Sequence, residues 1–219
     1  MEWHTDAELF ELIEGELFTA VIGDTLDANG YRHQFLPPRI RGLKNYGVVA
    51  GRAMPALEAD VFDDREPFGK MLDALDSLES GGSTSRPAER LATRSSVVSM
   101  SIAARARGAR AAILCGFHRD SRELLENSFP VFSYGAYAQD QQVRGRVIDY
   151  RVPIEIEGVA VAPGDIIVAD LDGVVVLPAD AETRIVYDAL RKVRTESEVR
   201  RELERGMLAK DAFDEFGVL

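Results

Sequence analysis

The chain has 219 residues, of which 46% are hydrophobic and 29% are charged, so it can bury a sizeable core. Its 37 acidic and 26 basic residues give a net charge of −11, which argues against nucleic acid and anionic membranes as partners, because both need a basic surface. A single cysteine excludes an internal disulfide framework, and no apolar run reaches the roughly 18 to 20 residues that span a bilayer.

The N-terminal segment is expected to be helical. Residues 1–12 show no positive start and no small-residue cleavage site, so we see no secretory signal and expect a cytoplasmic protein. Thr5 or Asp6 can cap a helix. The apolar residues that recur at helical spacing behind this cap are Leu9, Phe10, Leu12, Ile13, Leu17, Phe18, Val21 and Ile22.

The middle of the chain predicts alternating helices and strands. Asn29-Gly30 predicts a turn and Pro37-Pro38 an extended segment before a strand at 47–54. One helix is expected from Pro67 or Phe68 to Leu78. Residues 102–107 are expected to be the end of another helix, which Gly108 terminates. Further strands are expected at 111–115, 131–133, 159–161, 166–169 and 174–177, the last two joined by an Asp-Leu-Asp-Gly hairpin turn.

The C-terminal residues predict a long helix from Asp180 to Arg205, an interruption at Gly206 and a short helix at 208–216. Alternating charges from 191 to 205 favour a solvated helix with ion pairs four residues apart. The apolar end favours an arm that packs on a neighbouring subunit; its residues are Met207, Leu208, Phe213, Phe216, Val218 and Leu219. We expect an α/β domain at 1–180 and a helical arm at 181–219.

The strongest candidate for chemistry is the segment 116–123, directly after the predicted strand at 111–115. Strand ends are where α/β proteins place ligand-binding groups. Arg119 offers a planar fork for a carboxylate, and Asp120 and Glu123 offer the oxygen ligands that Mg²⁺ or Mn²⁺ prefers. The alternative is structural, with Asp120 capping a helix among surface ion pairs.

The three histidines show no metal-ligand spacing. His4, His33 and His118 are far apart in sequence, so each is interpreted as a surface or capping residue, with His118 the one candidate ligand because it adjoins Arg119.

Three segments together resemble the RraA-like family, which groups the regulator of ribonuclease E activity with metal-dependent 4-hydroxy-4-methyl-2-oxoglutarate and 4-carboxy-4-hydroxy-2-oxoadipate aldolases. They are Arg119-Asp120 with Glu123, the run from Val161 to Pro178 that contains Pro-Gly-Asp and Asp-Leu-Asp-Gly, and the ending Ala212 to Gly217. The resemblance covers nearly the whole chain from Ile22 onward.

This resemblance implies a swivelling β/β/α sandwich with an N-terminal helix and a C-terminal helical arm, assembled as a homotrimer or larger homo-oligomer. It implies a lyase that uses Mg²⁺, Mn²⁺ or another divalent metal to cleave 2-keto dicarboxylic acids, or to decarboxylate oxaloacetate, with release of pyruvate. Arg119 would hold the ketone oxygen or a carboxylate of the substrate, Asp120 would bind the metal, and Glu123 would orient water there. A glutamate from a neighbour's arm would act as base.

The resemblance also leaves a second function open, a non-catalytic regulator that binds a ribonuclease or another protein. The sequence departs from the family at Cys115-Gly116, where Asp-Gly is usual, and a lone buried cysteine there is expected to be inert. It departs more strongly at 81–101, where a glycine-rich loop should hold the pyruvate carboxylate and Ala88 and Glu89 stand near the expected glycine pair. An impaired aldolase is therefore also possible.

We hypothesise that segment 81–101 results from two compensating single-base errors in the gene sequence. The segment keeps the family's length but not its residues, and about twenty structureless residues inside a domain are uncommon. When allowed codons for it are read one base out of phase, they encode a strand, a glycine-rich loop and a helix start. Resequencing the gene tests this hypothesis.

Overall fold

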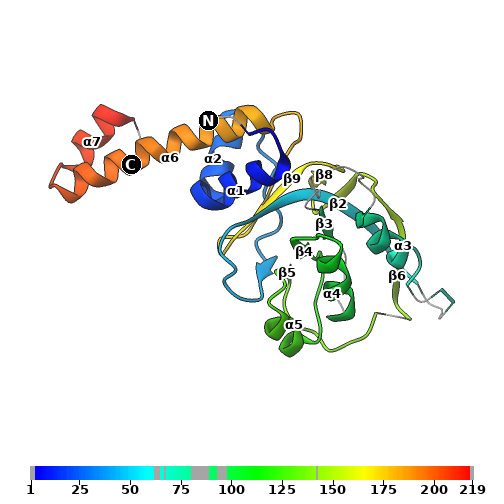
Figure 1. Ribbon diagram of the computed structural model, residues 1–219. Helices are drawn as coiled ribbons and strands as arrows, with labels where there is room; N and C mark the ends of the chain where they lie inside the picture. Colours follow the sequence, from blue (N-terminus) through cyan, green and yellow to red (C-terminus); the bar gives the residue numbers. More distant parts are fainter. Residues whose placement is uncertain are drawn as a thin grey trace.

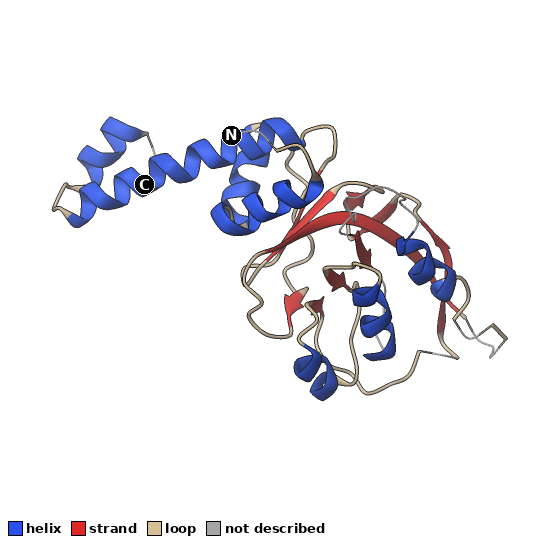
Figure 2. Ribbon diagram, viewed as in Figure 1, coloured by secondary structure: helices blue, strands red, loops and turns tan. Residues whose placement is uncertain are grey.

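A computed structural model describes residues 3–61, 65–66, 68–79, 89–92, 98–141 and 143–217. A twisted sheet runs through the body of the molecule with helices packed against it, and a helical extension leaves the body at one end (Figures 1 and 2). This is the mixed α/β architecture with an N-terminal helical part and a C-terminal helical arm that the sequence predicts.

The main sheet joins eight strands within the described residues in the order β1-β5-β4-β3-β2-β9-β10, and β6 pairs with the far end of β2. The strands are β1 (Arg41–Gly42), β2 (Val49–Asp60), β3 (Glu89–Ala92), β4 (Ala111–Ile113), β5 (Val131–Ser133), β6 (Gly145–Tyr150), β9 (Ile166–Ala169) and β10 (Val174–Leu177). The hairpin β7 (Ile154–Ile156) and β8 (Val159–Val161) forms a second sheet.

Strands β2, β3, β4 and β5 are parallel neighbours, whereas the other pairs are antiparallel. Their carboxyl ends therefore lie at one edge of the sheet, which is where open α/β folds bind ligands. β2 continues to Asp60, well past the predicted strand at 47–54, because its second half pairs with β6.

Two helices form the N-terminal part, where the sequence predicts one: α1 (Asp6–Glu16) and α2 (Thr19–Ala28). Thr5 caps α1 as expected, since its hydroxyl accepts a hydrogen bond from the amide of Glu8. The chain is extended at Phe18, which separates the helices. Their apolar stripes still form one core with β9, β10 and the first turns of α6 (Glu182–Glu204), as the spacing predicts.

Asp170 explains the break between α1 and α2. Its carboxylate accepts hydrogen bonds from the Thr19 amide at 2.8 Å, the Thr19 hydroxyl at 2.6 Å and the Asp172 amide at 2.9 Å. Asp165 works similarly, accepting from the amides of Ala162 and Ala179. Two of the three acidic residues in the run from Val161 to Pro178, Asp165 and Asp170, therefore hold the backbone together.

The same face of the sheet that α1 and α2 cover also carries, over β3 to β5, α3 (Met71–Asp76), a short 3-10 helix (Ser77–Glu79), α4 (Val98–Ala106) and α5 (Ser121–Asn127) (Figure 1). The β7–β8 hairpin packs on the opposite face. α3 is shorter than the predicted helix that ends at Leu78. Gly108 ends α4 with a φ of +94°, and β9 and β10 form the predicted hairpin.

The C-terminal arm consists of the outer turns of α6 and of α7 (Ala209–Phe216), which extend away from the sheet (Figure 1). Leu208 and Phe213 are 68% and 53% exposed on it. Packing of the arm on a neighbour, and a domain boundary at residues 180 and 181, stay predictions. Among the described helices, none combines the length and the apolar character needed to cross a bilayer.

Segment 81–101 is described only in part. Residues 81–88 and 93–97 lie outside the described residues, so the predicted glycine-pair position at Ala88 does too. Glu89, the other residue at that position, begins strand β3 and therefore does not lie in a loop. The connection from β3 to α4 is residues 93–97, which contain no glycine.

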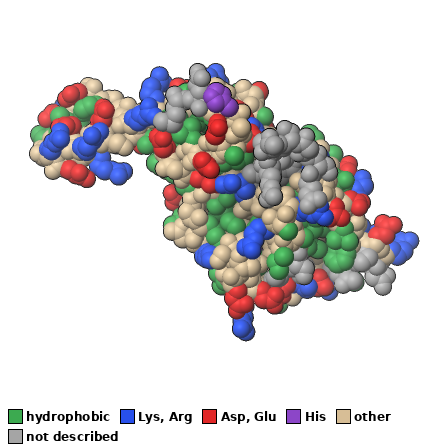
Figure 3. Space-filling view, viewed as in Figure 1, with side chains coloured by type: hydrophobic (Ala, Val, Ile, Leu, Met, Phe, Trp, Pro, Cys, Tyr) green, Lys and Arg blue, Asp and Glu red, His purple; other side chains and the backbone are tan. Residues whose placement is uncertain are grey.

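Charged side chains show no segregation on the face drawn in Figure 3. Acidic and basic side chains of the described residues are interspersed there, and apolar side chains show between them.

Candidate functional site

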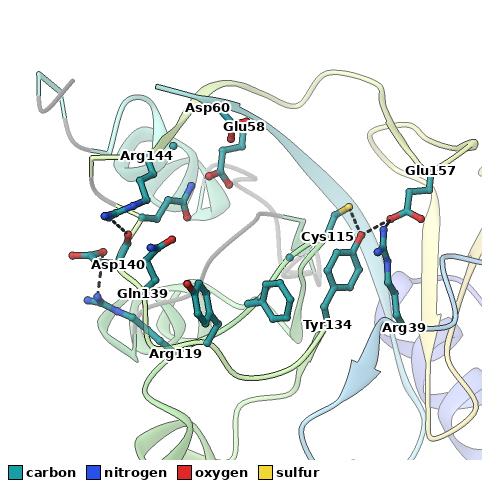
Figure 4. Close-up of a pocket in the computed structure, with 15 residues that line it drawn as sticks. Arg39, Glu58, Asp60, Cys115, Arg119, Tyr134, Gln139, Asp140, Arg144 and Glu157 are labelled. Carbon is teal, nitrogen blue, oxygen red and sulfur yellow. Dashed lines mark hydrogen bonds and ion pairs between the residues drawn. The ribbon is translucent and has the colours of Figure 1, made fainter. Parts of the chain in front are cut away.

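A pocket of about 490 Å³ opens at the carboxyl edge of the parallel strands (Figure 4). The residues that follow β4 and β5 form most of its wall, and the end of β2, the start of β6 and the β7–β8 turn complete it. Its lining mixes the aromatic rings of Phe117, Tyr134 and Tyr137 with acidic and basic groups. Such a concave, partly apolar pocket with a few polar groups is a typical small-molecule site.

Arg119 is the predicted site residue that lines this pocket. Its Nη1 lies 3.2 Å from Oδ1 of Asp140, and its Nε lies 3.5 Å from Oδ2 of Asp120. Asp140 thus holds the guanidinium, and its backbone carbonyl accepts a hydrogen bond from Arg144 at 2.9 Å. Arg119, Asp140 and Arg144 gather at one end of the pocket in Figure 4.

Asp120 and Glu123 line a different, shallower hollow on the α5 side, together with Glu126 and Asn127. Asp120 stands at the N-cap position of α5 but makes no capping hydrogen bond with its side chain, so the structural alternative of a capping aspartate is wrong. Its φ of +61° is a left-handed conformation that non-glycine residues rarely adopt. The side chains of Arg119 and Asp120 are therefore in contact, and Asp120 and Glu123 line the same hollow.

His118 is buried, which corrects the expectation of a surface or capping residue. Its Nδ1 lies 2.7 Å from the Ser133 hydroxyl and its Nε2 lies 3.0 Å from the Ser121 hydroxyl. Burial lowers the pKa of His118, which favours the neutral ring. Because both ring nitrogens have partners, His118 is not a metal ligand in this arrangement.

The opposite end of the pocket contains a chain of polar side chains. The Tyr134 hydroxyl lies 2.9 Å from the Cys115 thiol and donates to Glu157 at 2.6 Å, and Glu157 pairs with Arg39. Burial, followed by the hydrogen bonds with Cys115 and Glu157, raises the pKa of Tyr134. Cys115 is only half-buried and lines the pocket, so the expectation that it is buried is wrong.

The donors on the α5 side fit a hard divalent cation. Asp120 and Glu123 supply carboxylate oxygens at the hollow, and the Asp120 carboxylate keeps 39% exposure. Within the described part of the chain, no three or more His, Cys, Asp or Glu side chains are placed to enclose a metal. Mg²⁺ commonly binds through one or two carboxylates together with water and substrate oxygens, so two carboxylates suffice for it.

Sequence reasoning missed Asp140, Tyr134, Glu58 and Asp60, all of which line the pocket. The same rule that pointed to Arg119 could have found Tyr134, because it directly follows the predicted strand at 131–133. Glu58 and Asp60 were missed because the strand was expected to end at 54. No local pattern marks Asp140, whose place depends on the path of the loop after β5.

The RraA-like family model, described as Aldolase/RraA, matches residues 19–176. The chain belongs to the RraA-like family. This match includes Arg119 and Asp120 and most of the sheet, and it confirms the family-level prediction made from the sequence.

Similar proteins carry different names. A putative 4-hydroxy-4-methyl-2-oxoglutarate aldolase of Halalkalibacterium halodurans is 31% identical over 46% of this chain and 48% of its own. A structure from a study of novel cellulases from gut-associated microbes shares 25% identity and a TM-score of 0.78, and covers 90% of both chains. Streptomyces coelicolor RraAS2, an unusual member of the RNase ES inhibitor RraA family, shares 22% identity and a TM-score of 0.76 over 91% of this chain and 99% of its own.

The matched segments span about half or less of the length of the curated relatives. The family includes both putative aldolases and inhibitors of RNA processing, so membership does not decide between the two functions.

Proposed function

We propose that this protein is a divalent-metal-dependent lyase that cleaves or decarboxylates 2-keto dicarboxylic acids with release of pyruvate. The observation that carries the proposal is the Arg119–Asp120 pair, in which a guanidinium lines the pocket and the next residue's carboxylate, 3.5 Å from it, lines a second hollow. A substrate held by Arg119 would therefore lie near the Asp120 carboxylate.

The chemistry needs this combination of charges. Breaking the carbon–carbon bond beside a 2-keto acid leaves negative charge on the enolate oxygen of pyruvate, and positive groups placed there in advance stabilise it. Mg²⁺ or Mn²⁺, held by Asp120 directly or through water, would supply Lewis-acid stabilisation of the keto oxygen. Arg119 holds the substrate carboxylate or ketone oxygen, and Glu123 orients water on the hollow's side.

The proposal includes a homotrimer or larger homo-oligomer, in which a glutamate from a neighbour's C-terminal arm takes the proton of the substrate hydroxyl in aldol cleavage, as the carbon that bears this hydroxyl becomes a carbonyl and the carbon–carbon bond breaks. The exposed apolar residues Leu208 and Phe213 on the arm support such packing. The proposed partners are small 2-keto acids and further copies of the chain.

A pyruvate-release assay with Mg²⁺ tests the proposal. Oxaloacetate and 4-hydroxy-4-methyl-2-oxoglutarate serve as substrates, lactate dehydrogenase detects pyruvate, and the rate with Mg²⁺ alone is subtracted. We expect activity that a chelator abolishes and that Arg119→Ala lowers about 100-fold or more, since removal of one charge-stabilising group typically has this effect. Arg32→Ala is the matched control, because Arg32 is exposed and lies outside the pocket, the hollow and the arm.

One observation favours the second candidate function, a regulator that binds a ribonuclease or another protein. The connection from β3 to α4, residues 93–97, has no glycine, and a chain without glycine bends less readily to bring backbone amides around an anion. If neither this chain nor a variant with a glycine-rich loop at 81–101 releases pyruvate, the lyase proposal is wrong. Inhibition of a ribonuclease by the same protein then supports the regulator.

A further inference from the structure

His118 lies where two elements that form the site meet. It directly precedes Arg119 and Asp120, and its ring joins Ser133 at the end of β5 to Ser121 at the start of α5. The backbone of His118 is fixed as well, because its amide donates to Gly135 at 3.0 Å and its carbonyl accepts from Tyr137 at 2.8 Å. The imidazole therefore links the strand to the helix from within.

The residue that this link spans has an uncommon backbone conformation. Asp120 has φ +61° and ψ +37°, in the left-handed region that aspartate adopts more often than most non-glycine residues. Its side chain makes no capping bond, and its contact with Arg119 is long at 3.5 Å. The bond from His118 to Ser121 spans Asp120 along the chain, and the bond from His118 to Ser133 ties this turn to β5.

We propose that His118 is a positioning residue that fixes the Arg119–Asp120 pair in its two hollows by joining β5 to α5 through Ser133 and Ser121. The inference rests on the proposed function, because it assigns His118 to the geometry of that same site. The imidazole touches neither hollow and acts only through the pair.

Three variants separate the links. His118→Asn keeps an amide near the position of Nδ1 and so can retain the bond to Ser133, whereas His118→Gln keeps one near Nε2 and can retain the bond to Ser121. His118→Leu removes both bonds while filling a similar volume. His33→Leu is the matched control, since His33 is exposed and lies outside both hollows.

The variants are compared by pyruvate-release kinetics and by Mn²⁺ affinity from electron paramagnetic resonance. We expect His118→Leu to lower kcat/KM about 10- to 100-fold, because displacements near 1 Å at a reacting group have effects of this size. Mn²⁺ affinity should fall in the same variant, and His118→Asn and His118→Gln should each recover part of both losses. A residue that only fills space would not give recovery by the two amides.

The outcomes are distinguishable from failure of the proposed function. If the unaltered protein releases no pyruvate, the lyase proposal fails, and Mn²⁺ affinity together with amide hydrogen exchange at 119–124 still tests His118. Unchanged affinity and exchange in a folded His118→Leu overturn the positioning role. If His118→Leu does not fold, Ser121→Ala and Ser133→Ala each remove one link without disturbing the ring, and unaltered kinetics and affinity in both overturn it equally.

Discussion

Replacement of Asp170 tests whether the most recognisable run of this family serves the fold or the chemistry. The Asp170 carboxylate is 9% exposed and accepts three hydrogen bonds, two of them from Thr19 at the start of α2. Asp170→Ala removes a helix cap worth about 1 kcal/mol and hydrogen bonds to a charged group worth about 1.5–3 kcal/mol each. Because the Thr19 hydroxyl can turn to another acceptor, we expect a loss of about 3–5 kcal/mol in the free energy of unfolding.

Thermal unfolding followed by circular dichroism measures this loss. For a chain of this size we expect the melting temperature of Asp170→Ala to fall by about 6–20 °C, at about 2–4 °C per kcal/mol. Asp172→Ala is the matched control from the same Asp-Leu-Asp-Gly turn, because the Asp172 side chain is exposed. Activity per folded molecule should be unchanged in both variants. Equal melting of the two variants, or a loss of activity in folded Asp170→Ala, would refute the structural role.

Three further predictions concern the pocket and the gene. Asp140→Asn removes the charge beside Arg119, so kcat/KM in the pyruvate-release assay should fall about 10-fold while the melting temperature changes little, and unchanged kinetics contradict its role. Burial raises the pKa of Tyr134, so above about pH 10 its phenol stays protonated in the folded state but ionises in the unfolded state. The free energy of unfolding should therefore fall as the pH rises above about 10. Ultraviolet titration of Tyr134→Phe should lack one tyrosine that ionises at high pH in the unaltered protein. Resequencing should reveal two single-base differences across codons 81–101, and an in-phase reading that reproduces residues 83–100 would end that hypothesis.

The elements that sequence predicted correctly are those with a complete local signal. Strands β9 and β10 are continuous apolar runs on either side of an Asp-Leu-Asp-Gly turn, and the hairpin follows from these residues alone. The single N-terminal helix was wrong because the cap of α2 comes from Asp170, 151 residues away from Thr19. β2 was expected too short because its last residues pair with β6, which no local pattern announces.

The same distinction applies to the site. Arg119 was found because it follows an apolar strand directly, and strand ends are a rule of the fold. Asp120 and Glu123 face a different hollow from Arg119, and this could not be predicted. The left-handed backbone of Asp120 changes the direction of the chain directly after Arg119. Asp140 approaches Arg119 only through the path of the loop after β5, and the contact of His118 with Ser133 likewise depends on how β5 packs beside this turn.

Part of the pattern that identifies this family therefore serves the fold of this chain. Asp165 and Asp170 accept hydrogen bonds from backbone amides and hold α2 and the hairpin in place, a role that does not depend on which of the two functions the protein has. Under the lyase proposal, chemistry would depend on Arg119, on Asp120 and on a loop that holds the substrate carboxylate, and this chain has both side chains but no glycine at 93–97. The regulator alternative requires neither the two side chains nor the loop. A variant with a glycine-rich loop at 81–101 and with Arg119 in place therefore distinguishes the two. An impaired lyase should release pyruvate faster with the new loop, whereas a regulator should still release none.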